Sequence, residues 1–512
     1  MKTVCILTAG IGSRISKYTS YINKSLLPIK NKASISHIIE SFPKETSFVV
    51  AVGYLKDQVK DYIKIAHSDR KINFVEIANY KGKNSGPGFS LTSCKNYLQK
   101  PFYFISCDTI WDKKIFAEGQ KNWMGISSKF IRQNKDYCNL KTSKSKISNI
   151  IDKKKVNALH KHFIGLAYIY NYKEFWEGFV KIKKTNNEIQ VINGFKSLLN
   201  ISTIYTKKFN WYDVGTEQNY KKTLLKFEKY DFSKDNEFIY FVKDRVIKFF
   251  RSTKKTNKIL KKSKCSDLFP TIDIKKDNFI SYKFIPGQTL YENNNELIMK
   301  NLLECLKNNF WEKKNNDIKK YCKLFYYKKT KARISLYLKK YDIKKDDSKM
   351  INGLKVDTID KLLNKVPWDQ LYQGFASQIH GDLQFDNIIF NKNNSQFRLI
   401  DFREDFGGNI KVGDIYYDLA KLNGGIELNY SKIKKNQFKF TEKNASIEYS
   451  LKWKNYLYKK ILKNYIIKNN FSYFRVQLIT GLIFLNMCPL HKSPFDRLLF
   501  FHGKYILQKI LK

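Results

Sequence analysis

Two aspartates and one asparagine between residues 380 and 401 have the types and the spacing of a phosphoryl-transfer site. Asp382 precedes Asn387 by five residues, and a strand-like run at 397–400 leads directly into Asp401. In such a site one carboxylate accepts the proton of an acceptor hydroxyl, while an amide oxygen and a second carboxylate hold Mg²⁺ on the ATP phosphates. This chemistry is mostly positioning and charge neutralisation, so a few oxygen ligands on a rigid hairpin suffice.

The same stretch resembles a known family of small-molecule kinases. His380, Gly381 and Asp382, followed by Asn387 and then by Ile-Asp ending at Asp401, match the pattern of the aminoglycoside phosphotransferase and choline kinase family. The resemblance implies a protein-kinase-like fold, with Asp382 as the catalytic base and Asn387 and Asp401 as magnesium ligands. A surface loop with chance acidic residues would not explain why four polar residues and their flanking strands match together.

A glycine loop follows the first apolar run of the chain. Residues 3–9 are continuously apolar, which favours a buried parallel strand. The strand leads into a loop containing Gly10, Gly12, Ser13 and Arg14. Glycine lets backbone amides approach phosphate oxygens, and the arginine adds a cation. By itself the loop does not define a nucleotide site, because it lacks the Gly-Lys-Thr of a P-loop and completes no Gly-x-Gly-x-x-Gly.

The residues after the loop give it a context. The pairing of A-G-x-G-S-R with K-x-L-L-P, which begins at Lys24, resembles the sugar-phosphate nucleotidyltransferases. These Rossmann-like enzymes join a nucleoside triphosphate to a phosphorylated sugar or alcohol and release pyrophosphate. The resemblance implies that the glycine loop cradles the triphosphate, with Arg14 and Lys24 in catalytic roles and Lys24 paired with the phosphate charge. The alternative is a glycine turn with a surface lysine.

Two aspartates about a hundred residues apart extend this resemblance. Asp108 follows an aromatic run at 101–107, at the carboxyl end of an expected parallel strand, where open α/β sheets bind ligands. Asp213 lies within Trp-x-Asp-x-Gly-Thr at 211–216, a hallmark of the same family. The resemblance implies that both aspartates hold Mg²⁺. A metal bridging the α-phosphate and the attacking phosphate would neutralise two like-charged reactants.

Three further assignments rest on looser matches. Gly88 lies in a stretch, 84–91, that resembles the glycine-containing loop beside the nucleobase, although a plain turn is the alternative. Lys153 could bind the acceptor phosphate, but a solvated lysine is the simpler interpretation. Lys248, on the second arm of a hairpin expected at 238–252, resembles the phosphate-binding lysine of a kinase N-lobe. Residues 277–290 resemble the interlobe hinge, against whose backbone the adenine would lie.

The elements that must position these residues follow from the apolar patterns. Apolar runs and amphipathic segments alternate in the N-terminal half, as in a doubly wound α/β domain. The expected strands are 3–9, 47–54, 72–78, 101–111 and 162–170, and the expected helices are 57–66, one beginning at 187–192, and 219–232. Residues 296–375 and 446–512 are expected to be mainly helical. Asp414 and Asp418, four residues apart on one helix face, are expected to brace the catalytic loop.

The sequence therefore predicts two fold classes in one chain. Residues 1–232 are expected to form an α/β, Rossmann-like nucleotidyltransferase domain with a mostly parallel sheet and flanking helices. The remainder is expected to form an α+β, protein-kinase-like domain with two lobes: 236–295 as the N-lobe, and 296–512 as a helical insert and the C-lobe. Residues 233–237 form the polar boundary.

Composition limits the partners and the compartment. The chain has 95 basic and 46 acidic residues, a formal charge of +49, but the lysines are dispersed from end to end. We interpret this as a lysine-rich composition and expect no specific nucleic acid partner. No run of about 18 apolar residues predicts a transmembrane segment, and the short N-terminal apolar run predicts a first strand rather than a signal peptide. Eight scattered single cysteines indicate a reducing, cytoplasmic environment and argue against structural zinc.

Together the two resemblances suggest consecutive reactions. A kinase would make a phosphate ester from a small hydroxyl compound and ATP. A nucleotidyltransferase would then couple that ester to a second nucleoside triphosphate, with CTP or UTP favoured, and release pyrophosphate. The combination resembles bacterial enzymes that make precursors for capsule or lipopolysaccharide decoration, including fusions that act on phosphocholine.

Arg403 bears on the identity of the acceptor. Choline kinases of the family carry an acidic residue two positions after the metal aspartate, where this chain has Arg403. An arginine facing the acceptor would repel a quaternary amine. We therefore prefer a sugar or polyol as substrate over choline or another amino alcohol. Two alternatives stay open: a basic nucleic-acid- or surface-binding protein built on inactive enzyme folds, and a chain with one active and one regulatory domain.

Overall fold

The computed structural model describes residues 2–115, 119–129, 131, 135–179, 188–227, 236–293, 295–453 and 455–512. The chain forms two compact units. Unit 1 comprises Met1–Arg251 and Lys276–Ser281, and unit 2 comprises Ser252–Lys275 and Tyr282–Lys512. The polar boundary expected at 233–237 lies mostly outside the described residues, and unit 1 continues beyond it into the hairpin that follows.

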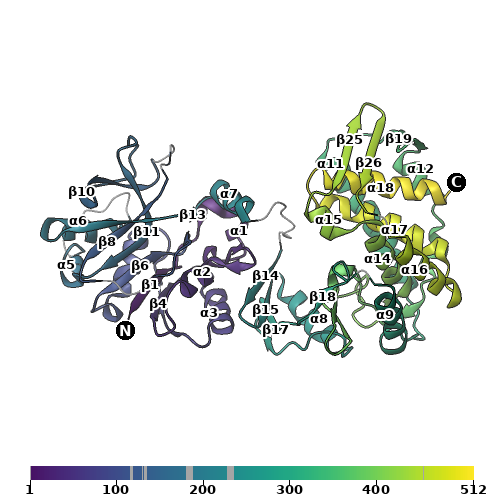
Figure 1. Cartoon of the computed structure of the whole chain (residues 1–512), viewed down its shortest axis with the longest axis horizontal. Coiled ribbons are helices and arrows are strands. Elements are labelled where there is room, and N and C mark those ends of the chain that lie inside the picture. Colours follow the sequence, from purple (N-terminus) through teal and green to yellow (C-terminus); the bar gives the residue numbers. More distant parts are fainter. Residues whose placement is uncertain are drawn as a thin grey trace. The chain divides into compact units, whose positions relative to one another are not determined.

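The centre of unit 1 is a sheet whose described strands have the order β5-β4-β1-β6-β11-β8-β12-β10-β9 (Figure 1). Four of them, β1 (Thr3–Leu7), β4 (Ser47–Val52), β5 (Lys71–Glu76) and β6 (Phe102–Ser106), are neighbours and run parallel. In chain order these strands lie third, second, first and fourth, as in one half of a Rossmann-like sheet. Every residue of β1 is buried, which confirms the interpretation of the first apolar run.

The other strands make the sheet mixed. β11 (Lys161–Ile169) is antiparallel to β6 and to β8 (Asn122–Ser127), while β12 (Ile204–Phe209) is parallel to β8. β9 (Cys138–Ser143) and β10 (Lys146–Asp152) form a hairpin whose turn contains Lys144 with a φ of 55°. The expectation of a mostly parallel sheet is confirmed for the first four strands and is wrong for the whole sheet. β11 pairs antiparallel with the distant strands β6 and β8, and the two-residue connection between β9 and β10 allows only antiparallel pairing.

Helices cover this sheet through apolar stripes. In α3 (Lys56–Ala66) the residues Val59, Tyr62, Ile63 and Ala66 are buried, which is the i, i+3, i+4, i+7 spacing of one helix face. A hydrophobic core joins the sheet to α4 (Pro87–Ser93), α5 (Tyr172–Glu177) and α6 (Ile192–Ile201). The expected helix at 57–66 is therefore confirmed, and the helix expected from 187–192 begins at the end of that range.

Shorter elements of unit 1 carry the motifs. They are α1 (Ser16–Thr19), the 3-10 helices η1 (Ser13–Ile15) and η2 (Lys24–Leu26), β2 (Pro28–Ile29), β3 (Lys32–Ala33), α2 (Ser34–Glu40), β7 (Thr109–Trp111), β13 (Trp211–Asp213) and α7 (Glu217–Phe227). The run expected as one strand at 101–111 is divided by a turn at Asp108, and β7 after the turn pairs with β13 as a separate two-stranded ribbon.

The hairpin expected at 238–252 is confirmed. β14 (Glu237–Val242) and β15 (Arg245–Phe250) pair antiparallel around Lys243, which has a φ of 55°. They belong to a sheet of the order β14-β15-β17-β16, with β16 (Ile274–Lys275) and β17 (Phe279–Lys283). The hydroxyl of Tyr240 donates to the main-chain oxygen of Leu26 at 2.8 Å, so the hairpin is anchored within unit 1.

Unit 2 contains a short sheet and a helical core. The sheet has the order β18-β22-β23, where β18 is Gln288–Thr289, β22 is Ile388–Asn391 and β23 is Gln396–Leu399. Among the helices, α17 (Tyr473–Met487) packs against α14 (Ile415–Glu427), α18 (Phe495–Ile510) and α11 (Lys329–Lys340). The other described helices of unit 2 are α8 (Thr253–Ser263), α9 (Glu296–Asn309), α10 (Lys319–Cys322), the π-helix η4 (Lys323–Lys328), α12 (Ile359–Lys365), α13 (Trp368–Tyr372), the 3-10 helix η5 (Phe385–Asn387), α15 (Tyr430–Lys434), α16 (Tyr456–Lys468) and the 3-10 helix η6 (Cys488–Leu490).

Two stretches expected to be helical contain strands. Residues 296–375 are mainly helical, but β19 (Lys349–Ile351) and β20 (Leu354–Val356) interrupt them. The expectation for 446–512 is wrong at its start, where β26 (Ser446–Leu451) pairs with β25 (Phe438–Lys443). Ile447 is buried between two more exposed neighbours, and Asn444 turns the chain with a φ of 49°, so this segment follows the twofold period of a strand.

Among the described residues, one helix is apolar enough to resemble a membrane span. The stretch Tyr473–Leu490 meets the length and hydropathy of a crossing helix, and 56% of it is buried inside the protein. The core helix of a globular unit meets the same criteria. The expected absence of a transmembrane segment stays a prediction.

Candidate functional site

Asp108 and Asp213 lie side by side in unit 1. The β7–β13 ribbon pairs Asp213 with Thr109, and the N–H of Val214 donates to the main-chain oxygen of Asp108 at 3.2 Å. Gly215 lies between the two carboxylates: a Cβ there would be 2.8 Å from Asp213 Oδ1 and 3.2 Å from Asp108 Oδ2. The ribbon thus brings together two aspartates that are distant in sequence, and the glycine leaves the space between them open.

Lys24 forms an ion pair with Asp108. Its Nζ lies 2.7 Å from Asp108 Oδ2. Burial opposes the ionisation of Asp108, but the charge and the hydrogen bond of Lys24, with a smaller contribution from Arg14, outweigh burial and lower its pKa. Asn23 fixes the backbone before Lys24, because its side chain donates to the main-chain oxygens of Thr8 at 3.1 Å and Tyr54 at 2.7 Å.

Asp213 is held by three donors and is electrostatically strained. Its Oδ2 accepts hydrogen bonds from the Tyr137 hydroxyl and from Asn219 Nδ2, and its Oδ1 accepts one from the N–H of Gly215, each at 2.6 Å. Burial and the neighbouring charge of Asp108 nevertheless raise the pKa of Asp213. A divalent cation between the carboxylates would relieve this repulsion, and oxygen donors of this kind fit Mg²⁺.

Sequence reasoning missed Tyr137, Asn219 and the bracing role of Asn23. Asn219 lies in the first turn of α7, just after the Trp-x-Asp-x-Gly-Thr motif, so its position gave a usable signal. Tyr137 reaches Asp213 from 76 residues away, a contact that only the fold creates.

The glycine loop follows β1, as expected. Gly12 has a φ of 71°, and its oxygen accepts hydrogen bonds from the N–H of Ile15 at 2.9 Å and from the Thr19 hydroxyl at 3.0 Å. Ser13 begins η1, and Arg14 in the same turn is near enough to lower the pKa of Asp108. No described atom lies within 4 Å of a Cβ built on Gly10, so no described neighbour requires a glycine there.

Gly88 packs closely against another segment of unit 1, whereas the side chain of Lys153 is exposed. Gly88 lies in the first turn of α4, where its N–H donates to the Ile189 oxygen at 2.7 Å and a Cβ would be 2.6 Å from the same oxygen. Close packing therefore requires this glycine. Lys153 is exposed, has a φ of 48°, and its N–H donates to the main-chain oxygen of Tyr137 at 3.1 Å. The ligand-binding roles of both residues stay predictions.

A second constellation lies in unit 2 around His380. The Nδ1 of His380 accepts the N–H of Asp382 at 3.1 Å, so Nε2 carries the proton and donates to the Ile400 oxygen at 2.8 Å. Burial lowers the pKa of His380 to about 4, which keeps the ring neutral. Asp418 accepts the N–H groups of His380 and Gly381 at 2.7 and 2.8 Å, as expected for a brace of the catalytic loop. Burial raises the pKa of Asp418 to about 6.

Asp414 has a different environment from that of Asp418. It caps the N-terminus of α14, where its Oδ1 accepts the N–H of Tyr416 at 3.3 Å, and it pairs with Arg475 at 2.9 Å. It also accepts the Tyr326 hydroxyl at 2.8 Å. Asp418 therefore braces the catalytic loop, as expected, whereas Asp414 caps α14 and pairs with Arg475.

The loop and the β22–β23 hairpin bring Asp382, Asn387 and Asp401 together. Asn387 Nδ2 donates to the main-chain oxygen of Asp382 at 2.8 Å, which leaves Oδ1 as its acceptor atom. The main-chain oxygen of Asn387 accepts the N–H of Ile400 at 2.9 Å, and Asp401 follows with a φ of 58°. Asn387 and Asp401 thus stand at the same end of the hairpin, as a pair of oxygen ligands for Mg²⁺ would.

Lys421 and Arg403 border Asp382. The Nζ of Lys421 lies 2.8 Å from Asp382 Oδ1, and its side chain is 5% exposed. Arg403 Nε donates to the Gly381 oxygen at 3.2 Å, and its guanidinium lies over the Phe325 ring at 5.3 Å. Lys421 gave no signal in the sequence, because it follows the loop by some forty residues.

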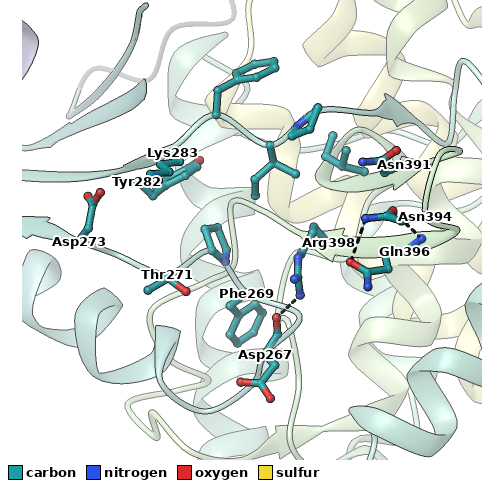
Figure 2. A pocket seen from close by; sticks show the side chains of 15 residues that line it. Asp267, Phe269, Thr271, Asp273, Tyr282, Lys283, Asn391, Asn394, Gln396 and Arg398 are labelled. Carbon is teal, nitrogen blue, oxygen red and sulfur yellow. Dashed lines mark hydrogen bonds between the residues drawn. The ribbon is translucent and has the colours of Figure 1, made fainter. Parts of the chain in front are cut away.

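Unit 2 also contains a pocket of about 510 Å³ on the face of this hairpin (Figure 2). The run at 282–286, part of the expected hinge, lines one side, and Ile389 and Asn391 of β22 line another. Figure 2 shows Tyr282 and Lys283 opposite Asn391, Asn394 and Gln396, with Arg398 between them. Lys248 is buried on β15 and belongs to unit 1, so its role as a phosphate-binding lysine stays a prediction.

In the described ranges, no three His, Cys, Asp or Glu side chains converge as metal ligands. Each site instead offers two oxygen-bearing side chains: Asp108 with Asp213, and Asn387 with Asp401. Mg²⁺ commonly binds one or two protein ligands of this kind and completes its shell with water and substrate phosphates. The residues present therefore fit magnesium held jointly with a nucleotide.

No protein-family model matches the chain. It is 26% identical over 219 residues to the "Bifunctional protein GlmU" of Methanococcus vannielii, covering 41% of this chain and 51% of that protein. It is also 26% identical over 215 residues to the same-named protein of Methanocaldococcus jannaschii, covering 41% and 50%. The chain spans about half the length of these curated relatives.

Solved structures cover a similar share of the chain. A UDP-glucose pyrophosphorylase complexed with UDP-glucose is 17% identical and covers 44% of this chain and 98% of its own, with a TM-score of 0.38. The CTP:phosphocholine cytidylyltransferase LicC of Streptococcus pneumoniae is 20% identical and covers 44% and 99%, with a TM-score of 0.36. The N-terminal part of the chain is thus similar in sequence to proteins named GlmU, and its first four strands have the order of one half of a Rossmann-like sheet.

Replacing Lys24 by methionine is expected to strengthen metal binding and weaken nucleotide binding. Without nucleotide, the ammonium competes with a cation for Asp108, so Lys24→Met should bind Mn²⁺ about tenfold more tightly, or ~1.4 kcal/mol. Affinity for CTP or UTP should fall about tenfold, because a cation opposite the phosphates is lost. Titration calorimetry measures both. The exposed Lys17→Met is the control, and an unchanged Mn²⁺ affinity in Lys24→Met would contradict this account of the ion pair.

His380 is expected to stay neutral far below its usual titration range. Its ¹³C-edited NMR signal, assigned by its loss in His380→Asn, should titrate near pH 4 in the folded protein and near ~6.5 in urea. Between these values the unfolded chain binds more protons, so this residue lowers stability as pH falls, by at most ~3 kcal/mol. A folded-state titration above pH 6 would show that the ring is not held as described.

Proposed function

We propose that the chain is a bifunctional enzyme: unit 2 phosphorylates a small hydroxyl compound, and unit 1 couples the phosphate ester to a nucleoside triphosphate. For unit 1, the observation that carries the proposal is the pair Asp108 and Asp213 facing each other across Gly215, with Lys24 beside them. The glycine loop follows the central strand, where Rossmann-like sheets bind phosphate. Similarity of 41% of the chain to the protein named bifunctional GlmU supports this assignment.

The arrangement in unit 1 suits the attack of one phosphate on another. An oxygen of the phosphate ester attacks the α-phosphorus, a new P–O–P link forms, and the bond to pyrophosphate breaks. Mg²⁺, held by Asp108 and Asp213 when bound, would neutralise charge on both phosphates. Lys24 and Arg14 supply further positive charge, and the amides of Gly10, Gly12 and Ser13 would cradle the triphosphate. Tyr137 and Asn219 position Asp213, and Lys153 is the proposed contact for the ester phosphate.

For unit 2, the proposal is a protein-kinase-like domain in which Asp382 accepts the proton of the acceptor hydroxyl. Asn387 and Asp401 would hold Mg²⁺ on the ATP phosphates. We assign the pocket of about 510 Å³ beside 282–286 as the base site, and the role of Lys248 as a phosphate contact stays a prediction. The domain limits of 236–295 for the N-lobe and 296–512 for the insert and C-lobe are part of this proposal.

The product of unit 2 belongs to the substrate class of unit 1. This match is the reason for combining both activities in one pathway. The proposed second nucleotide is CTP or UTP, and the proposed acceptor is a sugar or polyol. An activated sugar or alcohol of this type would serve the decoration of cell-surface polysaccharide or lipopolysaccharide.

Single substitutions should separate the two steps. Asp382→Asn removes the proposed base, so activity from the free hydroxyl compound should fall at least about a thousandfold, while activity from its phosphate ester is retained. Asp108→Asn should do the reverse, so that the phosphate ester accumulates. Pyrophosphate release and ³¹P NMR measure the two steps, with Asp360→Asn and Asp57→Asn as surface controls. If Asp382→Asn loses both activities while folded, the two-step proposal fails.

A further inference from the structure

Basic side chains gather near Asp382 in unit 2, and a further one, Arg333, lies near Arg403 and Lys329. Lys421 contacts its carboxylate at 2.8 Å, and Arg403 borders the preceding glycine. Lys329 begins α11, and Arg333 follows one helical turn later. The proposed base is thus surrounded by more positive charge than one carboxylate balances.

Two aromatic rings packed edge to face lie next to three of these cations. The rings of Phe325 and Tyr417 lie 4.8 Å apart. The Lys329 ammonium lies 3.8 Å from the centre of the Phe325 ring, and the Arg403 guanidinium lies 5.3 Å from it. Lys421 lies 6.0 Å from the centre of the Tyr417 ring. The distances place the three cations around one aromatic platform next to Asp382.

Only part of this positive charge is balanced by acidic residues of the described structure. Lys329 and Arg333 form no ion pair with any described residue. Burial opposes the charge of Arg403, but Tyr417, Asp382, Glu404 and Asp405 outweigh it and raise its pKa. Glu404 also pairs with Lys255 at 3.4 Å and Asp405 with Lys258 at 2.6 Å, so their charge is shared with lysines outside the cluster. Burial, and then the charges of Arg403, Lys421 and Arg333, lower the pKa of Lys329. The charged form of Lys329 is therefore unfavourable in the absence of a further counter-charge.

A purely structural role explains only part of this cluster. Lys421 orients Asp382, and Arg403 packs on Phe325 while bonding to Gly381. Neither role needs Lys329 or Arg333. Lys329 also follows directly on the π-helix η4, and such helical irregularities are frequent at functional sites because they redirect side chains.

We infer that the hydroxyl acceptor of unit 2 is an anion, whose carboxylate or phosphate group is bound by Lys329, Arg333 and Arg403 beside Asp382. The inference rests on the proposed kinase function and deepens it. The acceptor hydroxyl attacks the γ-phosphorus of ATP, its O–P bond forms, the bond to ADP breaks, and the hydroxyl proton passes to Asp382. The product carries its new phosphate in addition to the original anionic group. Amino alcohols are disfavoured, because their cation would meet this cluster.

A matched series of acceptors tests the inference. Glycerol, glycerate, glycerol 3-phosphate and serinol differ mainly in charge, as do glucose, glucuronate, glucose 6-phosphate and glucosamine. With ATP and Mg²⁺, an acidic member should have a kcat/KM at least tenfold above its neutral counterpart, and the carboxylate and phosphate arms identify the group recognised. Preference for neutral or cationic members would overturn the inference and leave the kinase intact. ADP release with none of the acceptors would instead contradict the proposed kinase function.

Variants locate the recognition. Lys329→Met and Arg333→Gln should each raise KM for the acidic acceptor about tenfold, change kcat less than twofold, and leave KM for the neutral counterpart unchanged. Lys331→Met, exposed on the same helix, is the matched control and should change neither constant. Equal losses with acidic and neutral acceptors would show that Lys329 and Arg333 support the fold rather than the anion. Circular dichroism of each variant establishes that it is folded.

Discussion

A lysine ammonium beside a partly buried carboxylate is the interaction on which each proposed site depends. In unit 1, Lys24 lies 2.7 Å from Asp108, and in unit 2, Lys421 lies 2.8 Å from Asp382. Both proposed reactions bring polyanions to these carboxylates, so the sites need positive charge before the substrates arrive. In both, the lysine supplies that charge while it fixes the carboxylate in place.

Hydrogen bonds with surrounding side chains, buried or partly buried, keep these groups in position. Tyr137 and Asn219 hold Asp213, while a neutral His380 and the buried Asp418 hold the loop that carries Asp382. Such bonds fix geometry without adding mobile charge next to the reacting phosphates. The two proposed reactions are also linked: unit 2 would make phosphate esters, and unit 1 would consume them.

Local sequence patterns predicted the features that depend on residues close together in the chain. The continuous apolar run before Gly10 becomes the buried β1, and the spacing from Asp382 to Asn387 places both on one loop and hairpin. The mixed sheet was not predictable, because strand direction depends on pairing between distant segments. Tyr137, Lys421 and Lys329 were missed for the same reason: a lysine in a lysine-rich chain, or a tyrosine among many, acquires meaning only through its neighbours in the fold.

The central claim is that phosphate added by unit 2 passes into the product of unit 1. It is tested most directly by supplying [γ-³²P]ATP, Mg²⁺, unlabelled CTP or UTP and the free acceptor to the intact chain. The account predicts that label appears in the β-phosphate of the nucleoside diphosphate product, because that phosphorus comes from the phosphate ester. Label confined to ATP and inorganic phosphate, or a nucleoside diphosphate product that forms without it, would contradict the account.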